Sequence, residues 1–180
     1  MRQPNEYSVL LGKSYEELRL EAYDDGGGNW TIGWGHTSDA KLKVTPGLKI
    51  TEQKADELHI YDLLEAAQII DRELAHENDL SDNQYSALVD LAYNSGSLKV
   101  RSLGHQWVPS ELLAALNNHD FNAAGEFIKT HDIRVNGRVW KGLKRRRLAE
   151  YFLYTGHRVG ELAPKDWVRW ARIEVDRLIA

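Results

Sequence analysis

The spacing of hydrophobic positions is typical of strands near the N-terminus and of helices over most of the remaining chain. Near the N-terminus, Leu18, Leu20 and Ala22 alternate with polar or half-polar side chains, which is typical of a half-exposed strand. Turn-forming residues at 24–29, three of them glycine, separate this segment from the strand-like residues 30–34. The two segments together predict a β-hairpin.

Most of the remaining chain shows helical spacing. A first helix is expected from Tyr7 to about Glu17, although its apolar periodicity is poor. Ile50 and Thr51 have the pattern of a hydrophobic staple and an N-cap, and predict a long helix that ends near Leu74. Further helices are predicted over 82–93, 111–117, 121–129, 141–154 and 165–179. A small hairpin followed by segregated helices predicts the α+β class.

The length of 180 residues fits a single domain with a sizeable core, expected over residues 1–180. Its parts are a β-containing segment at about 17–50, a connecting helix at 51–74, a helical part at 75–155 and a C-terminal helical extension at 156–180. In the extension, apolar and arginine side chains mix over 165–180. This pattern fits either an amphipathic helix that touches membranes or a helix that packs on the core.

Composition excludes several classes of protein. The chain has no cysteine, which excludes disulfides and thiolate chemistry. Residues 1–100 contain 9 Lys/Arg and 18 Asp/Glu, whereas residues 101–180 contain 14 and 9, so two faces of different charge are expected. No apolar run approaches the roughly 18 residues of a membrane span, and the N-terminus lacks the apolar core of a signal peptide. We therefore expect synthesis and retention in the cytoplasm.

Neither a metal nor another cofactor is expected. The seven histidines are scattered along the chain, and the His-Glu-x-x-His motif does not occur. The acidic segment 77–82 lacks the glycine of a calcium-binding loop, and is interpreted as a solvated connection between helices.

Candidate chemistry is concentrated in Glu16, Asp25 and Thr31. Glu16 is expected at the C-terminal end of a helix, whose dipole disfavours the ionised carboxylate. Asp25 lies in a glycine-rich turn, where backbone hydrogen bonds favour the ionised form. Two carboxylates in different environments suit acid–base cleavage of an acetal. The alternative is structural: Ser14 and Glu17 match a capping box, which would make the acids part of a helix start.

The string Glu-x-x-Arg-Leu-x-x-Tyr-x-Asp runs from Glu16 to Asp25, and Trp-Thr-Ile-Gly-x-Gly-His-Thr occupies 30–37. Both resemble the signature of phage-type lysozymes, a family that includes the T-even phage lysozyme and many endolysins. The resemblance continues in 84–96, 116–121 and 137–150, and covers roughly residues 7–155. It implies a lysozyme-like fold, in which an active-site cleft separates a small β-hairpin lobe from a larger helical lobe.

The resemblance also implies roles for the three candidates. Glu16 would protonate the glycosidic oxygen, Asp25 would activate water or stabilise the transition state, and Thr31 would position the water. The bond cut would be the β-1,4 link from N-acetylmuramic acid to N-acetylglucosamine in peptidoglycan. The family's best-known member inverts the anomeric carbon, which requires carboxylates about 6.5–9.5 Å apart.

Further residues follow from the same resemblance. Asn94 would bind the sugar N-acetyl group, although a plain helix-end polar residue is an equal interpretation, and Gly35 would line the cleft. One of Arg145 and Arg146 would pair with Glu16 while the other basic residues meet the cell wall. A structural histidine of the family corresponds to His36, with Asp62 as its partner.

Two departures from the family pattern bear on the site. Glu17 stands where the family usually has glycine, and Asp24 beside Asp25 leaves the identity of the base open. Other functions also stay open: a lytic transglycosylase, an inactive wall-binding module of the same fold, and a nucleic-acid-binding protein using the basic run 144–147. The expected partners are peptidoglycan and a holin-type membrane protein that releases a monomeric enzyme, and not nucleic acid.

Overall fold

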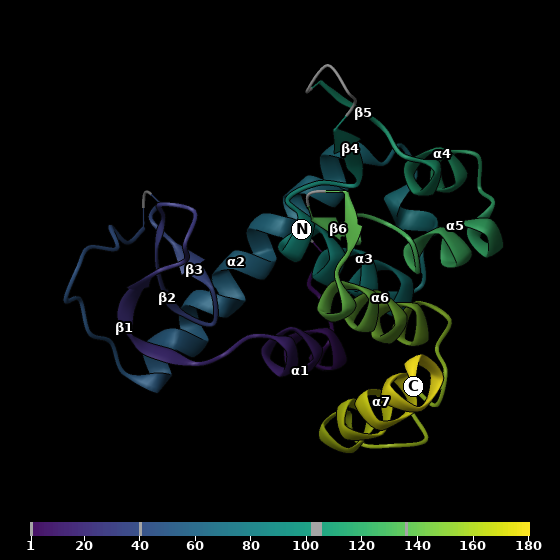
Figure 1. The fold of residues 1–180 in the computed structure, drawn as a ribbon. Helices are drawn as coiled ribbons and strands as arrows, with labels where there is room; N and C mark the ends of the chain where they lie inside the picture. The colour runs from purple at the N-terminus through teal and green to yellow at the C-terminus, as the bar shows by residue number, and fades with distance from the viewer. Residues whose placement is uncertain (1, 40, 102–105, 136) are drawn as a thin grey trace.

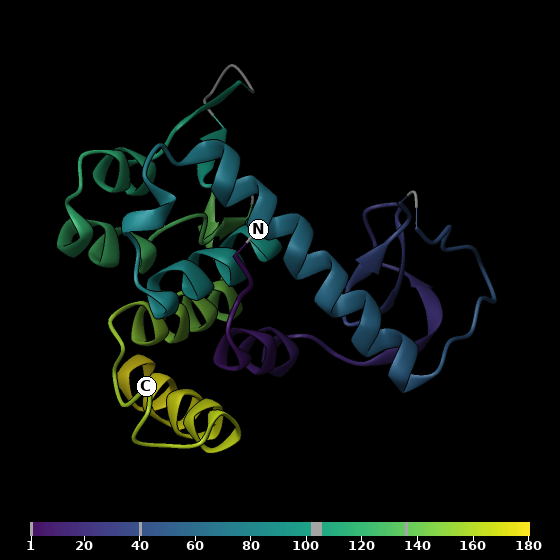
Figure 2. The same ribbon diagram turned by 180° about the vertical axis from the view of Figure 1, so that it is seen from behind.

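The computed structural model describes residues 2–39, 41–101, 106–135 and 137–180. It joins a small antiparallel sheet to a larger body of helices, and one long helix runs from one to the other (Figures 1 and 2). The predicted α+β class is confirmed.

The sheet consists of β1 (Arg19–Asp24), β2 (Trp30–Gly33) and β3 (His36–Thr37), which pair antiparallel in this order. The long helix is α2 (Glu52–Glu73). The other helices are α1 (Glu6–Tyr15), the short 3-10 helix η1 (Glu77–Asp79), α3 (Asp82–Ser95), α4 (Glu111–Asn117), α5 (Phe121–Ile128), α6 (Lys141–Tyr154) and α7 (Pro164–Ile179). The predicted helices are all present, with small differences at their ends.

Helix α1 shows how local chemistry sets the direction of the chain before the sheet. The Asn5 side chain caps it by accepting a hydrogen bond from the backbone nitrogen of Ser8. The helix ends at Tyr15, slightly before the predicted end, because the backbone becomes extended at Glu16. Ser14 lies in the last turn and donates to the Leu11 carbonyl. The capping-box interpretation of Ser14 is therefore wrong.

Strand β1 is present as predicted, but its alternation is broken. The pairing register with β2 shifts between Arg19 and Tyr23, as in a β-bulge. Leu20 is 40% exposed, whereas Ala22 is buried against the small core of the sheet. The apolar stripe read from the sequence is thus split between two faces.

The ends of the long helices follow ordinary capping rules. The Thr51 side chain accepts from the backbone nitrogen of Lys54 at 3.1 Å and begins α2. Helix α3 begins with a capping box between Ser81 and Gln84 and ends at Gly96, where φ is +76°. The helical core surrounds α3, and its fully buried side chains include Leu63, Tyr85, Leu88, Leu91, Leu98, Leu112 and Leu153.

Two short hairpins were not predicted. One pairs β4 (Lys99–Arg101) with β5 (Trp107–Pro109), and the other pairs β6 (Arg134–Val135) with β7 (Arg138–Val139). Strands of two or three residues are too short to show a period-two pattern.

Helix α7 packs back on the helical body rather than standing free (Figure 1). Trp167 and Ala171 are fully buried, and the Trp167 indole nitrogen donates to the His157 carbonyl at 2.8 Å. The Trp167 ring also meets Tyr7 of α1 edge-on, with centroids 5.7 Å apart. The packing interpretation of the C-terminal segment is therefore correct. Within the described residues, every helix falls short of the length and apolarity that crossing a membrane requires.

Candidate functional site

Glu16 lies where α1 gives way to the segment that enters β1. Its Oε1 accepts a 2.5 Å hydrogen bond from Nη1 of Arg146 on α6, and its side chain is 25% exposed. The other oxygen, Oε2, faces the turn between β2 and β3, since a Cβ placed on Gly35 would lie 3.5 Å from it. One carboxylate oxygen is thus fixed by a cation and the other is directed toward the sheet.

Arg146 is the centre of a buried ion cluster. Its guanidinium lies 3.2 Å from both Asp90 oxygens and 3.4 Å from Glu150, and both acids are fully buried. Burial alone would lower the pKa of Arg146, but the charges of Asp90, Glu150 and Glu16 outweigh it and raise that pKa. Because the cation is held from several sides, it holds Glu16 in one orientation.

The neighbouring Arg147 orients Asn94. It is fully buried, makes an ion pair with Glu150, and donates through Nε to the His131 carbonyl at 2.9 Å. Its Nη2 donates to Oδ1 of Asn94 at 2.5 Å. The Asn94 carbonyl oxygen is therefore engaged, and the amide nitrogen is the group left to donate to a ligand.

The basic run 144–147 does not form a surface stripe. Arg146 and Arg147 are buried in ion pairs, and Arg145 points to α7, where its Nε donates to Asp176 at 2.8 Å. The geometry therefore does not support a phosphate-binding surface at this run. It also identifies Arg146 as the partner of Glu16, whereas the substrate-binding role predicted for Arg145 stays a prediction.

A cavity of about 310 Å³ opens beside Glu16. It is lined by Tyr15, Glu16, Asn94, Trp140, Gly142, Leu143 and Arg146. Trp140 is 60% exposed at its edge, so the cavity combines an acid, an amide and an open aromatic surface. Convergent polar groups on partly apolar walls are typical of a small-molecule or sugar site.

The pairing of β1 with β2 separates the two adjacent aspartates. Tyr23 pairs with Thr31, and Asp24 pairs with Trp30 on the opposite face. The backbone nitrogen of Asp25 donates to the Asn29 carbonyl, which extends the hairpin geometry by one residue. Side chains alternate between faces, so Asp25 returns to the face of Tyr23 and Thr31 whereas Asp24 does not.

The Asp25 carboxylate is held by the turn that follows it. It accepts from the backbone nitrogens of Gly27 at 2.7 Å and Asn29 at 3.1 Å, and from the Asn29 side-chain amide at 3.3 Å. The Gly27 hydrogen bond, then the two from Asn29, lower the pKa of Asp25. Asp25 is therefore an ionised carboxylate in a fixed direction, which is what a base requires.

Thr31 lies on the same face and is only 3% exposed. Its hydroxyl oxygen has no hydrogen-bond partner among the residues that the structure describes. A buried hydroxyl in this condition gains from binding a small polar group. This environment is consistent with the role predicted for Thr31, which stays a prediction.

Tyr23, which pairs with Thr31 across the sheet, was not among the predicted site residues. Burial raises the pKa of Tyr23, and the charge of Glu16 adds to the effect. Arg19 opposes the shift, and Asp25 contributes a smaller increase. The charges of Glu16 and Asp25 therefore both act on the Tyr23 side chain.

The backbone conformation of Gly35 and the close approach of Tyr93 both disfavour a side chain at this position. Its φ is +105°, and a Cβ would lie 3.2 Å from the hydroxyl of Tyr93. That hydroxyl donates to the Trp34 carbonyl at 2.5 Å and fixes the turn next to Glu16. Gly35 thus lets the β2–β3 turn approach the acid closely.

His36 and Asp62 lie together as predicted, on β3 and α2. Nδ1 of His36 is 2.9 and 3.1 Å from the two Asp62 oxygens, and the ring is 3% exposed. The pair connects the sheet to the long helix. A second cavity of about 300 Å³, lined by Gly35, His36, Asp62 and Tyr93 among others, continues along α2 on this side.

Glu17 takes no part in the site. Its carboxylate lies 2.9 Å from Arg19, and its side chain is 73% exposed. The second acid therefore faces solvent rather than Glu16.

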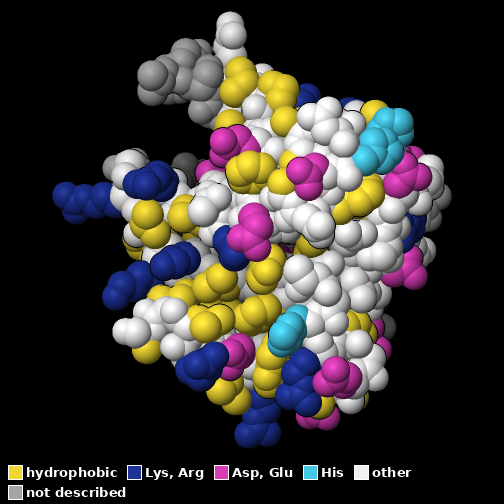
Figure 3. Space-filling view, turned by 90° about the vertical axis from the view of Figure 1, so that its right-hand side faces the viewer, with side chains coloured by type: hydrophobic (Ala, Val, Ile, Leu, Met, Phe, Trp, Pro, Cys, Tyr) yellow, Lys and Arg dark blue, Asp and Glu magenta, His cyan; other side chains and the backbone are white. Residues whose placement is uncertain are grey.

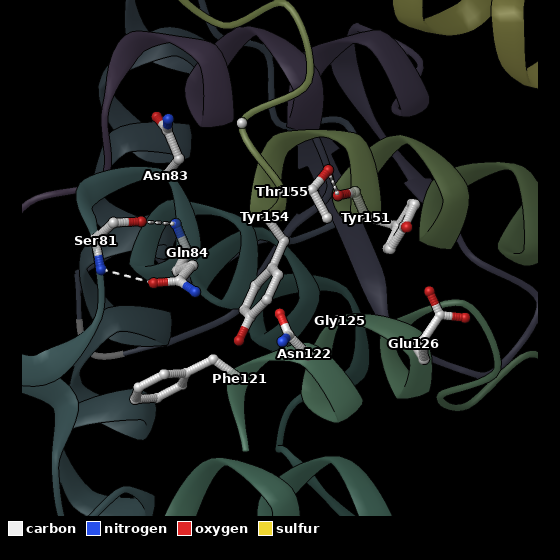
Figure 4. Close-up of a pocket in the computed structure, with 11 residues that line it drawn as sticks. Ser81, Asn83, Gln84, Phe121, Asn122, Gly125, Glu126, Tyr151, Tyr154 and Thr155 are labelled. Atoms are coloured by element: carbon white, nitrogen blue, oxygen red, sulfur yellow. Dashed lines mark hydrogen bonds between the residues drawn. The ribbon is translucent and has the colours of Figure 1, made fainter. Parts of the chain in front are cut away.

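The largest described cavity, about 600 Å³, lies elsewhere, between the start of α3, α5 and the end of α6 (Figure 4). It is lined by polar and aromatic side chains that include Asn83, Gln84, Phe121, Asn122, Glu126, Tyr151 and Tyr154. Its acid, Glu126, is paired with Lys129. Since none of the predicted catalytic residues lines it, cavity size does not identify the site here.

The chain is similar in sequence to known phage proteins. Residues 13–150 match the family profile described as Phage lysozyme. An endolysin of Acyrthosiphon pisum secondary endosymbiont phage 1 is 33% identical over 153 residues, which cover 83% of this chain and 96% of that protein. An endolysin of Bacillus phage B103 is 36% identical over 149 residues, which cover 81% of this chain and 51% of the relative.

Solved structures show the same fold. The active form of the P1 phage endolysin Lyz gives a TM-score of 0.74 at 25% identity, with 88% of each chain covered. The muramidase domain of SpmX from Asticaccaulis excentricus gives a TM-score of 0.69 at 29% identity, covering 86% of this chain and 98% of that domain.

Proposed function

Since this chain belongs to the phage lysozyme family and is a peptidoglycan hydrolase, we propose that it cuts the β-1,4 bond between N-acetylmuramic acid and N-acetylglucosamine. Glu16 is the general acid in this proposal, Asp25 the general base, and Thr31 the residue that positions water. The observation that supports it most directly is the orientation of Glu16. Arg146 engages Oε1 and leaves Oε2 directed toward Gly35.

Each group has one task in the proposed reaction. Glu16 gives the proton on Oε2 to the glycosidic oxygen, so the leaving sugar departs as an alcohol. Asp25 takes a proton from a water held near the Thr31 hydroxyl, and that water attacks the anomeric carbon from the opposite face. Attack from that face inverts the anomeric centre. In this proposal the amide nitrogen of Asn94 binds the carbonyl of an N-acetyl group; the engagement of its oxygen by Arg147 and its position in the cavity beside the acid support this role.

The products test the reaction type. Digestion of purified peptidoglycan should release soluble muropeptides with reducing muramic acid ends, as identified by mass spectrometry. Anhydro-muramic ends would instead identify a transglycosylase, which needs no water. Binding to the cell wall without release of fragments would identify an inactive binding module.

Paired substitutions test the choice of base. Asp25→Asn should reduce the rate of muropeptide release by about 100-fold, because the amide cannot accept the proton of water. Asp24→Asn should leave the rate close to that of the wild type, because Asp24 lies on the other face and only accepts from the Gly26 backbone nitrogen. Equal loss in both variants would contradict the assignment of Asp25.

The cellular setting stays a prediction. We propose that the enzyme remains in the host cytoplasm as a monomer and reaches the periplasmic wall after a holin-type protein has permeabilised the membrane.

A further inference from the structure

A group of metal-ligating side chains lies on the helical body, away from the elements that hold Glu16 and Asp25. His76 precedes η1, Asp79 ends it, and His119 lies in the turn between α4 and α5. Figure 3 shows histidine side chains gathered beside acidic ones on this face. We propose that His76, Asp79 and His119 form a binding site for a divalent transition metal ion, with zinc as the ion that fits best.

The three side chains already converge. Nδ1 of His119 lies 3.4 Å from Oδ2 of Asp79, and the rings of His76 and His119 are 4.3 Å apart between centroids. One ligand atom from each residue lies within 4.8 Å of the others. Tetrahedral zinc with ligands at 2.0–2.2 Å needs donor atoms about 3.4 Å apart, which the His119–Asp79 pair meets. Rotation of the exposed His76 side chain brings the third ligand into range.

The backbone on either side of His119 fixes the position of this residue. His119 has φ of +59°, a left-handed conformation that is unusual for a residue other than glycine. Its backbone nitrogen donates to the Leu116 carbonyl, and the next residue, Asp120, caps α5 through the Ala123 nitrogen at 3.0 Å. The imidazole is therefore held between the end of one helix and the start of the next.

A hydrogen bond also joins the two segments that supply the ligands. The backbone nitrogen of Ala75 donates to Oδ1 of Asn117 at 3.1 Å. Residue 75 precedes His76, and Asn117 ends α4. Because the segments are tied together, a metal ion would meet a partly organised site rather than two independent loops.

The donor set favours zinc over calcium or magnesium. Two imidazoles and one carboxylate are nitrogen-rich, whereas calcium and magnesium prefer oxygen ligands. His119 and Asp79 are about half exposed, at 47% and 51%, which leaves room for water as a fourth ligand. The ion would clamp the connection after α2 to the α4–α5 turn and stabilise the helical body.

The structure offers an internal control. Among the described residues, the other group with three candidate ligands is His36, Asp39 and Asp62. It has a single imidazole, which is 3% exposed and already bonded through Nδ1 to Asp62. Asp39→Asn removes one candidate ligand from this second group and leaves the proposed site intact.

Calorimetric titration with zinc chloride at pH 7.5 tests the proposal. The full chain is used without a polyhistidine tag, after treatment with chelator. The wild type and Asp39→Asn should each bind one zinc ion with equal affinity. His119→Asn, which tolerates the left-handed backbone, and Asp79→Asn should each weaken binding at least tenfold. Zinc at about 100 times its dissociation constant should raise the wild-type melting temperature by roughly 5–10 °C.

Two further outcomes decide the matter. Unchanged affinity in both ligand variants, or loss of binding in Asp39→Asn instead, would overturn the proposal. The absence of binding heat and of any thermal shift in the wild type would also overturn the proposal. Peptidoglycan hydrolysis is measured separately and does not depend on this site.

Discussion

Replacing Glu16 by glutamine should reduce the rate of peptidoglycan hydrolysis by roughly 10²–10⁴-fold, the usual contribution of a positioned general acid. The amide has the same shape and keeps an oxygen to accept the hydrogen bond from Arg146. It has no proton acidic enough to assist the leaving sugar. Release of soluble muropeptides from purified cell walls gives the rate, and urea unfolding should show nearly unchanged stability.

Glu17→Gln is the matched control, since it makes the same chemical change one residue away. Its carboxylate is exposed and paired with Arg19, so activity should stay close to that of the wild type. Full activity in Glu16→Gln would remove Glu16 from the mechanism. Equal loss in both variants would point to the negative charge of this segment rather than to a single acid.

Arg146→Met should produce the largest loss of stability, about 3–5 kcal/mol, because it leaves buried charges without their cation. Asp90 and Glu150 are both fully buried against the guanidinium. Methionine fills part of the volume but provides neither charge nor donors. Urea unfolding of the variant against the wild type at pH 7 measures the difference, and hydrolysis should fall as well because Glu16 loses its orientation.

Arg145→Met is the control for this substitution. Arg145 pairs with Asp176 at the surface, so its loss should cost about 1 kcal/mol or less. The pH dependence provides a second readout. Burial already raises the pKa of Glu150 and the charge of Arg146 opposes that rise, so without Arg146 this pKa rises further and the deficit of the variant should be smaller at pH 5 than at pH 8. A deficit independent of pH, or equal losses in the two variants, would contradict the ion-cluster account.

The helices could be predicted from the sequence because their signals are local. Thr51 and the Ser81–Gln84 box mark helix starts through contacts within one turn of the chain. The bulge in β1 has no such signal, because it depends on how two strands align, and it leaves Leu20 exposed while Ala22 stays buried. The two short hairpins could not be predicted because strands of two or three residues show no period-two pattern.

The candidate site could also be predicted only in part. Glu16, Asp25 and Thr31 came from spacing and family resemblance, but the sequence could not choose between Arg145 and Arg146, which point in different directions from the same helix. Tyr23 and Asp90 were not predicted as residues of the site. A charged Asp90 between Val89 and Leu91 in an apolar helix was a signal that a buried cation lies opposite it.

Helix α7 makes the folding unit of this protein larger than the part that it shares with its family. The family match ends at residue 150, yet Arg172 of α7 bonds to the carbonyl of Ser14 and lies over the Tyr15 ring at 5.1 Å, beside the acid that follows α1. A chimaera cut at residue 150 would lack α7 and would therefore lose the contacts of Arg172 with the two residues before Glu16. Engineering of this enzyme should therefore treat residues 164–179 as part of the catalytic scaffold and place fused modules beyond them.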